Sequence, residues 1–360
     1  MEGREGKSTR GKRLRSVTIF LVYVYVAGIV MFCFVLRGGL SSLNFRDDSY
    51  MSYTKMINWT AEWPYVYRTL LPSLVKFVGA LTPTAVKQRV NSYAENKPFL
   101  KKIGWTTRYS YECLVSLGFI FVVWIAFAYS VRHLVQMVYV TDPAVSDMAP
   151  VAALLLVPAF FLENWTAIYD PMVVLMGSLG PLLILKREHK WYYVFFPLAV
   201  LNKVTAVIFT CAFAAREFRY MSGVRLGAHI AAQIMIWAGL MALLGFLFKD
   251  NPGTKAHFQL FWNLGGFVLS VSLLHTLYSL AFFAGFAFLI GYQWKKKPKV
   301  LRQVFLAMAL LFIPAVMMFG RAMDELRVWY DLYPAAFLVA LPSICSILQI
   351  EMTSRPEFDG

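Results

Sequence analysis

Apolar runs of about 20 residues recur along this chain of 360 residues, and almost no charged side chain interrupts them. A helix of about 20 apolar residues spans the hydrocarbon core of a bilayer and satisfies its own backbone polar groups there. Hydrophobic residues make up 59% of the chain and charged residues 15%, which excludes an ordinary soluble globular protein. We therefore predict an all-α polytopic membrane protein. The runs lie at about 17–36, 110–131, 149–163, 168–186, 191–215, 226–248, 266–292, 304–320 and 327–348.

Several functional classes lack support in the composition and motifs. The formal net charge is +15, but the basic residues lie between the apolar runs and not on a soluble module, so no nucleic acid partner is predicted. The four cysteines form no CxxC pair, which argues against a zinc site and a disulfide framework. The glycine-rich nucleotide-binding motifs, HExxH and GxSxG are also missing, so the NTPase, dehydrogenase, zincin and α/β-hydrolase classes are not indicated.

The run 191–215 differs from the others because Asn202 and Lys203 interrupt its middle and both of its flanks are basic. A single crossing would place one flank, and every later cytoplasmic loop, outside the cell, against the positive-inside rule. Two half-length helices, 191–201 and 204–215, that enter and leave on the cytoplasmic side restore the expected distribution of charge. We therefore predict a re-entrant helical hairpin. The later loop that decides the choice carries Lys295, Lys296, Lys297, Lys299 and Arg302.

This topology predicts about eight transmembrane helices plus the hairpin in one transmembrane domain, 17–348, with both termini cytoplasmic. A basic tail, 1–16, precedes a first span whose length and missing A-x-A site distinguish it from a signal peptide. A cytoplasmic tail, 349–360, follows the last span. The long loop 37–109 is placed outside, and part of it is predicted to form an amphipathic helix on the outer leaflet. The apolar residues of that helix are Leu70, Leu71, Leu74, Phe77, Val78 and Leu81.

Four polar segments fall on the predicted outer side of the membrane. Paired carboxylates can act as a general base or bind a divalent cation, and arginine binds phosphate oxygens through two parallel hydrogen bonds. Together these groups suit a phosphate-bearing substrate. A plainer interpretation stays open for each segment, because carboxylates are common in solvated turns and charges three or four residues apart pair on helix surfaces. The segments are Asp47-Asp48, Tyr65-Val66-Tyr67-Arg68, Glu163 to Asp170, and Arg321 to Arg327 with Asp324 and Glu325 between them.

Lys203 lies between the two predicted half-helices, at membrane depth. An ammonium group is costly there, so the side chain is expected to face a partner or an aqueous cavity, beside the unpaired backbone groups of the helix tips. Three interpretations remain open. Lys203 is a cation for an anionic substrate, or half of a buried ion pair with a structural carboxylate, or a lysine that reaches headgroup water.

Three short segments occur in a suggestive order along the chain. The first is Tyr67-Arg68-Thr69-Leu70-Leu71-Pro72 after the first span, the second is Asn202-Lys203-Val204-Thr205-Ala206, and the third is Glu325-Leu326-Arg327 at the start of the last span. They resemble the YRxLLP-like, N-[KR]-x-T-A and E-x-R segments of short bacterial members of the polytopic GT-C fold glycosyltransferases. One position departs from that likeness, because Val204 stands where the N-[KR]-E-T-A form has Glu.

The resemblance implies a GT-C-like enzyme that transfers a sugar, with inversion, from a polyprenyl-phosphate-linked donor to a glycan, lipid or protein acceptor. The reaction would take place on the outer, periplasmic face of a bacterial inner membrane. Asp47 or Asp48 would act as the base or as a ligand of a divalent metal ion, which is compatible with the sequence but not required by it. The lipid phosphate would be bound by Arg68, Lys203, Arg321 and Arg327, with supporting roles for Tyr67, Glu163, Asp170, Asp324 and Glu325.

Two other functional classes also fit the sequence. A flippase or transporter of a lipid-linked anion would use the same lysine in the same broken helix, because half-helices often build binding sites near the membrane midplane. It would move its substrate without breaking a bond. A non-catalytic membrane scaffold would need none of the outer charged residues.

Overall fold

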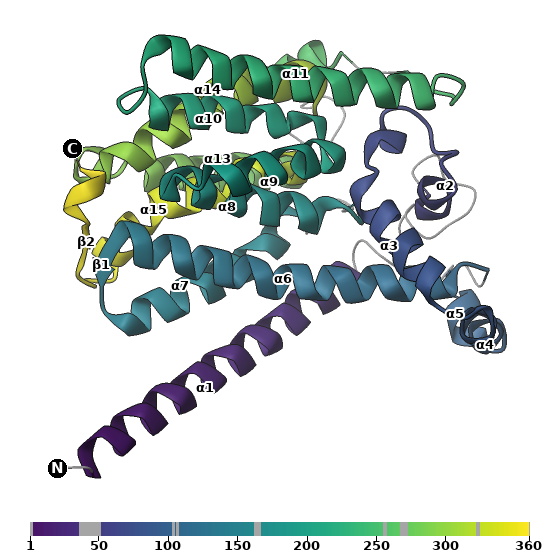
Figure 1. The fold of residues 1–360 in the computed structure, drawn as a ribbon, viewed down its shortest axis with the longest axis horizontal. Helices are drawn as coiled ribbons and strands as arrows, with labels where there is room; N and C mark the ends of the chain where they lie inside the picture. Colours follow the sequence, from purple (N-terminus) through teal and green to yellow (C-terminus); the bar gives the residue numbers. More distant parts are fainter. Residues whose placement is uncertain are drawn as a thin grey trace.

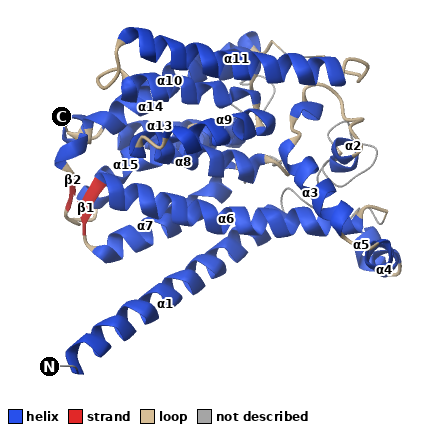
Figure 2. Cartoon of the chain, viewed as in Figure 1, coloured by secondary structure: helices blue, strands red, loops and turns tan. Residues whose placement is uncertain are grey.

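Helices make up almost the whole of the described chain (Figures 1 and 2). The computed structural model describes residues 3–35, 52–102, 105, 108–161, 167–254, 258–266, 273–321 and 325–359. Within these residues the only sheet pairs two short antiparallel strands, β1 (Tyr139–Thr141) and β2 (Met352–Ser354). The predicted all-α class is therefore confirmed.

Most of the helices are long and joined by short connections. The shorter helices α2 to α5 lie between α1 and α6 in the chain. The first half of the chain contains α1 (Gly3–Phe34), α2 (Tyr53–Ile57), η2 (Tyr65–Tyr67), α3 (Leu70–Leu81), α4 (Thr84–Glu95), α5 (Pro98–Lys102), α6 (Ser110–Val138), α7 (Pro143–Leu156), η3 (Val157–Phe160) and α8 (Asp170–Lys186). The second half contains α9 (His189–Asn202), η4 (Val204–Val207), α10 (Ile208–Glu217), α11 (Gly223–Leu247), η5 (Trp262–Gly266), α13 (Leu273–Gly291), η6 (Trp294–Lys296), α14 (Lys299–Phe319), η7 (Leu326–Asp331), α15 (Tyr333–Ile347) and η8 (Pro356–Phe358).

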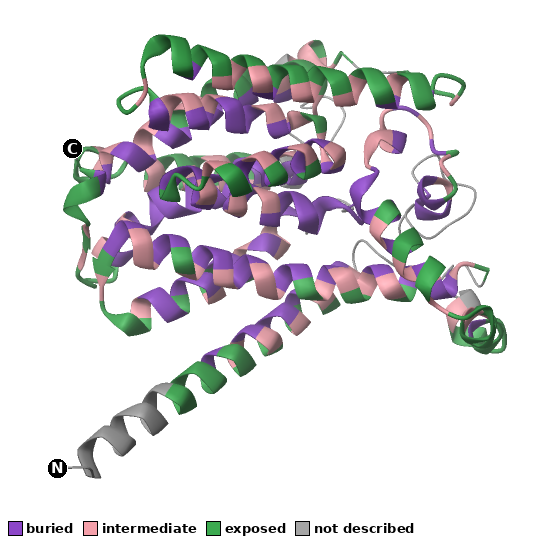
Figure 3. Ribbon diagram, viewed as in Figure 1, coloured by how far each residue is buried: buried purple, intermediate pink, exposed green. Residues whose placement is uncertain are grey.

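Among the described residues, five helical segments are long and apolar enough to cross a membrane, which fits an integral membrane protein. Three further expected spans correspond to α8, α13 and α15, which have 17, 19 and 15 residues. Of the described helices, α11 is one of the most exposed, with Leu226, Gln233 and Leu244 as its buried residues (Figure 3). The five long segments are Arg13–Phe34, Ser110–Val138, Pro143–Phe160, Gly223–Leu247 and Lys299–Phe319.

The apolar run 191–215 forms two helices that fold back on each other. A single straight helix of this length would separate its ends by about 37 Å. Instead, the guanidinium of Arg187 lies 3.0 Å from a carboxylate oxygen of Glu217, and the ring centroids of Tyr192 and Phe213 are 5.2 Å apart. The helices are broken at Lys203, whose backbone is extended. The predicted pair of half-length helices is therefore present in the fold.

Two glycines of α8 allow other elements to approach that helix closely. A Cβ atom on Gly180 would lie 2.7 Å from the ring of Phe209 in α10. A Cβ atom on Gly177 would lie 3.0 Å from the backbone oxygen of Asp331 in η7. A larger residue at either position would push α10 or η7 away from α8. The buried helix α8 therefore sets the positions of α10 and η7.

The predicted amphipathic helix is present as α3, but its apolar residues face two ways. Leu71 and Val75 are buried against the protein, whereas Phe77 and Leu81 are exposed. Lys76 lies 4.6 Å over the ring of Trp59, and burial lowers the pKa of its ammonium group. The helix therefore packs on the protein through Leu71 and Val75 and leaves Phe77 and Leu81 outward, and its place on the outer leaflet stays a prediction.

Both termini lie at the same end of the helix bundle, opposite the short helices α2 to α5 (Figure 1). At that end Asp147 joins two helices, since it pairs with Arg15 of α1 and with Arg132 of α6. The predicted basic tail is helical from Gly3 onward, and the predicted C-terminal tail forms β2 and η8. The end regions are thus part of the folded structure.

Candidate functional site

The centre of the candidate site is η7, a short helix between α14 and α15. Arg327 is 8% exposed and pairs with two carboxylates: its Nη1 lies 3.3 Å from Asp170 Oδ2 and its Nη2 lies 2.8 Å from Glu325 Oε2. Asp170, at the start of α8, also accepts a hydrogen bond of 2.7 Å from the backbone N–H of Ala167. The two carboxylates balance the buried guanidinium, whose removal from water would otherwise be costly.

Lys203 forms an ion pair with Asp331, the last residue of η7. The side chain of Lys203 is 14% exposed and that of Asp331 is 5% exposed. Thr205 donates a second hydrogen bond, of 2.7 Å, to the other oxygen of Asp331. Of the three interpretations of Lys203, the buried ion pair is the arrangement that the structure displays.

Arg68 is the cation of the site that has no carboxylate within 4.0 Å among the described residues. Its guanidinium carbon lies 4.4 Å over the ring of Tyr169, the residue before Asp170. Its Nε is buried and has no hydrogen-bond partner in the described part of the chain. Arg68 is thus held by an aromatic ring while its capacity to bind an anion remains uncommitted.

The three short segments that carry the GT-C likeness meet in this region. The backbone N–H of Thr69 donates to the carbonyl of Leu201 at 3.0 Å, which attaches the first segment to the second. Lys203 attaches the second segment to Asp331 of η7, the helix that contains Leu326 and Arg327 of the third segment. These residues are more than 100 positions apart in sequence, 132 from Thr69 to Leu201 and 128 from Lys203 to Asp331. The fold therefore gathers the predicted binding residues Arg68, Lys203 and Arg327, with Asp170 and Glu325.

Tyr67 and Arg321 lie at the edge of this group. The ring of Tyr67 packs edge-to-face on Trp63 with centroids 4.2 Å apart, and burial raises the pKa of its hydroxyl. The side chain of Arg321 is 42% exposed, 3.8 Å from Glu325, and its guanidinium lies 4.7 Å over the ring of Trp262. An exposed pair of this kind contributes about 0–1 kcal/mol to stability. Arg321 is therefore the most exposed of the paired cations at this site.

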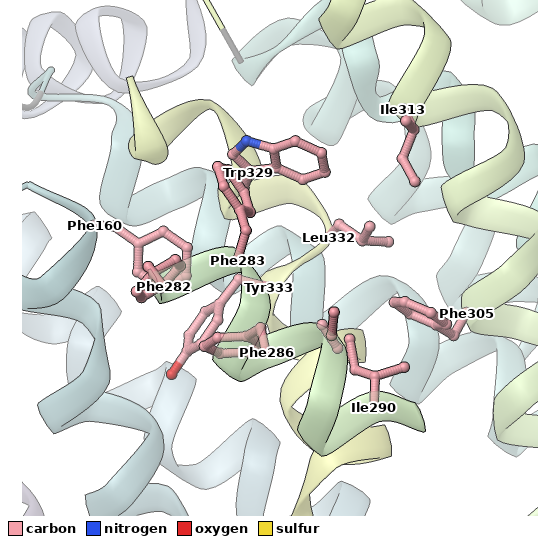
Figure 4. Close-up of a pocket in the computed structure, with 12 residues that line it drawn as sticks. Phe160, Phe282, Phe283, Phe286, Ile290, Phe305, Ile313, Trp329, Leu332 and Tyr333 are labelled. Atoms are coloured by element: carbon pink, nitrogen blue, oxygen red, sulfur yellow. The ribbon is translucent and has the colours of Figure 1, made fainter. Parts of the chain in front are cut away.

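An apolar cavity of about 220 Å³ lies on the other side of η7 (Figure 4). A 3₁₀-helix has three residues per turn, so Leu326, Trp329 and Leu332 share one face and Arg327 lies on another. Trp329 and Leu332 line the cavity, while Arg327 and Asp331 make the ion pairs. One short helix thus separates a charged layer from an apolar one. The remaining lining residues are Phe160, Phe282, Phe283, Phe286, Ala287, Ile290, Phe305, Ile313, Tyr333 and Ala336.

Four predicted site residues, Asp47, Asp48, Glu163 and Asp324, lie outside the described residues. Within the residues that the structure does describe, no three His, Cys, Asp or Glu side chains gather as ligands of a metal ion. The base and the metal site therefore stay predictions from the sequence.

Sequence reasoning had not assigned a role to Asp331, Thr205, Tyr169 or Trp329. A signal for Asp331 was present, because it is a lone carboxylate near the start of an apolar run and therefore needs a buried partner. Thr205 stands two residues after Lys203 in the quoted segment. Tyr169 and Trp329 gave no such signal, since aromatic residues are abundant throughout this chain, at 16%.

In comparisons with known proteins, the chain matches no family model, no curated protein and no solved structure.

Proposed function

We propose that this protein is a membrane glycosyltransferase that uses a polyprenyl-phosphate-linked sugar as its donor. The observation that carries the proposal is the two-sided arrangement at η7, with the ion pairs of Arg327 and Asp331 on one side and the apolar cavity on the other. A lipid-linked phosphate has the matching form, an anionic group joined to an apolar chain. The meeting of the three GT-C-like segments at the same place supports this assignment.

Arg68 is the residue best suited to bind the donor phosphate. Lys203 and Arg327 are already neutralised by Asp331, Asp170 and Glu325, so a phosphate would have to compete with these carboxylates. Arg68 carries no such partner in the described chain, and its guanidinium carbon lies 4.4 Å over the ring of Tyr169. Lys203 and Arg327 hold the site together through their ion pairs, and Arg321 adds a cation at the exposed edge of the site.

The reaction follows from these roles. Asp47 or Asp48 removes the proton from an acceptor hydroxyl, whose oxygen attacks the anomeric carbon of the donor sugar. The bond from that carbon to the phosphate oxygen breaks, the configuration inverts, and polyprenyl phosphate leaves with its charge stabilised by Arg68. The acceptor is a glycan, a lipid or a protein on the outer face, and a divalent metal ion at the aspartates is compatible with this scheme.

The proposal includes a topology in a bacterial inner membrane. About eight helices span the bilayer, α9 and α10 form a re-entrant hairpin, both termini are cytoplasmic and the site faces the periplasm. Its support is the contact between Arg187 and Glu217, which brings the two basic flanks of the hairpin together.

Cysteine labelling tests this topology. In a chain without its four native cysteines, Glu188→Cys and Met221→Cys should both resist an impermeant thiol reagent added from outside, whereas the control Lys97→Cys should react. Labelling of Met221→Cys but not of Glu188→Cys would show that 191–215 crosses the membrane once.

The activity is tested with the full-length protein in vesicles that contain a polyprenyl-phosphate sugar and an acceptor extract. The expected result is release of polyprenyl phosphate and loss of the sugar-bearing lipid, with Asp47→Asn plus Asp48→Asn as the inactive control. In cells, loss of the protein should remove a glycosylated product and raise the amount of the donor lipid. Vesicles in which the donor lipid stays intact with every acceptor tested would contradict the proposal.

One observation favours the transporter class as the second candidate. Lys203 and Asp331 form an ion pair at the break between two half-helices, where transporters often place their binding sites. A transporter would move the intact lipid-linked anion between leaflets, so the donor lipid would change sides without releasing its sugar. The vesicle assay separates the two functions.

A further inference from the structure

Arg216, in the last turn of α10, is a buried cation without a carboxylate partner. The residue is 9% exposed, and none of the described carboxylates lies within 4.0 Å of its nitrogens. Its neighbour Glu217 is fully engaged, because both of its oxygens accept 3.0 Å hydrogen bonds from Arg187. Burying an unpaired guanidinium is costly, so the arrangement calls for an anion from elsewhere.

The contacts of Arg216 leave part of its hydrogen-bonding capacity unused. Its guanidinium lies 4.9 Å from the ring centre of Tyr220 and 5.8 Å from that of Phe358. Nη1 donates to the Tyr220 hydroxyl at 3.2 Å, but Nε is buried and has no hydrogen-bond partner in the described chain. The aromatic rings cover the faces of the guanidinium, whereas an anion would bind to its N–H edge.

A second arginine that contacts an aromatic ring and has an unbonded Nε among the described residues lies on the neighbouring helix. Arg302 is in the first turn of α14, its guanidinium lies 5.5 Å over the ring of Trp294, and its Nε is also buried without a hydrogen-bond partner among the described residues. Helices α10 and α14 pack along each other, and η8 contacts α14 while its Phe358 covers Arg216. The two arginines are therefore brought to one region by three elements.

This region lies at the end of the bundle that holds both termini, where the connecting loops are basic. The loops around 186–190, 216–225 and 293–302 contain Glu188 and Glu217 as their only carboxylates. Phe218 and Val224, two and eight residues after Arg216 in sequence, are 75% and 87% exposed, as expected for side chains that meet acyl chains. The basic residues of these loops include Lys186, Lys190, Arg219, Arg225, Lys295 and Lys296.

We propose that Arg216 and Arg302 form a binding site for the phosphate of an anionic glycerophospholipid in the leaflet at this end of the bundle. Arginine suits a phosphate diester because its N–H groups match two phosphate oxygens, and basic sites between transmembrane helices are a recognised place for anionic headgroups. A free phosphate ion has the same anionic oxygens. The exposed apolar side chains of Phe218 and Val224 favour the lipid, since a free ion would make no use of them. This site is separate from the one at η7 and does not depend on the proposed transferase activity.

The test uses the full-length protein in nanodiscs of phosphatidylcholine with a minor fraction of phosphatidylglycerol, followed by native mass spectrometry of the retained lipid. Arg216→Gln and Arg302→Gln should each lower phosphatidylglycerol retention about tenfold, the effect of losing a hydrogen bond from a charged donor to the phosphate. Arg219→Gln is the matched control, because it removes the same charge from an exposed position three residues from Arg216. Its retention should stay close to that of the unmodified protein.

Two results would overturn the proposal. The first is equal retention by Arg216→Gln, Arg302→Gln and Arg219→Gln, which would mean that only the general positive charge attracts the lipid. The second is displacement of phosphatidylglycerol by millimolar inorganic phosphate, which would assign the site to a soluble anion. Arg302 is only partly buried, so Arg302→Gln should fold even if Arg216→Gln does not, and thermal unfolding of each variant checks this.

Discussion

Replacing Lys203 by methionine removes the ammonium group while keeping an unbranched side chain of similar length. Asp331 would then remain 5% exposed, with the hydrogen bond from Thr205 as its remaining contact from this group. Removing one partner of a buried ion pair leaves a buried charge and costs about 3–5 kcal/mol of folding free energy. We therefore expect Lys203→Met to be destabilised by about that amount at neutral pH.

The double variant Lys203→Met plus Asp331→Leu should recover most of this loss, because no charge is then left buried and apolar side chains can pack in its place. The single variant Asp331→Leu should be as unstable as Lys203→Met, since it leaves the ammonium group buried. The free energy of unfolding would be measured for all four proteins in mixed micelles. The interaction energy of the cycle is the loss of unfolding free energy in the double variant minus the sum of the losses in the two single variants.

A loss below about 1 kcal/mol in both single variants, or an interaction energy near zero, would refute the view that this pair holds the hairpin to η7.

Three further predictions concern other groups. Arg68→Lys should lower kcat/KM for donor about 10²-fold, because a point ammonium does not reproduce the planar fork, while Arg321→Lys should change it little; equal effects would contradict the special role of Arg68. Asp47→Asn or Asp48→Asn should slow transfer about 10²–10⁴-fold with normal amounts of protein in the membrane, and near-normal turnover of the double variant would remove both from the mechanism. Lys297 donates to two carbonyls at the end of α13, so Lys297→Met should cost about 1–3 kcal/mol. Burial lowers the pKa of Lys297 from 10.5 to about 8, so the unfolded chain binds more protons than the folded chain between pH 8 and pH 10.5. The free energy of unfolding should therefore rise with pH in this window, and Lys297→Met should lack this rise.

The helices and the broken hairpin could be predicted because their causes are local. Apolar runs of spanning length require helices in lipid, and one lysine between two basic flanks was enough to favour a break at 203. The structure ends α9 at Asn202 and starts η4 at Val204, in agreement with that position. The number of spans was less predictable, because α8 and α15 are shorter than a typical crossing and their lengths depend on packing with neighbours.

The partners of the polar residues could not be predicted, because they come from distant parts of the chain. Nothing near Lys203 in sequence identifies Asp331, and nothing near Arg15 identifies Asp147. The two-sided character of η7 was also hidden, since an apolar run was expected to continue as one α-helix from residue 327. The 3₁₀ segment directs Trp329 to the apolar cavity and Arg327 to Asp170. This arrangement depends on how η7 packs against α8, which the sequence of η7 does not reveal.

The distance along the chain between Asp170 and Arg327 has a consequence for biosynthesis. The two residues are 157 positions apart, and a ribosome adding about 5–20 residues per second needs on the order of 8–30 s to reach the second after the first. During that interval the carboxylate of Asp170, at the start of α8, lacks the guanidinium of Arg327 that later pairs with it. Helices α8 and α9 must therefore tolerate an incomplete state until the last helix arrives. A nascent chain cut short before η7 would leave the charges of both Asp170 and Lys203 without these partners.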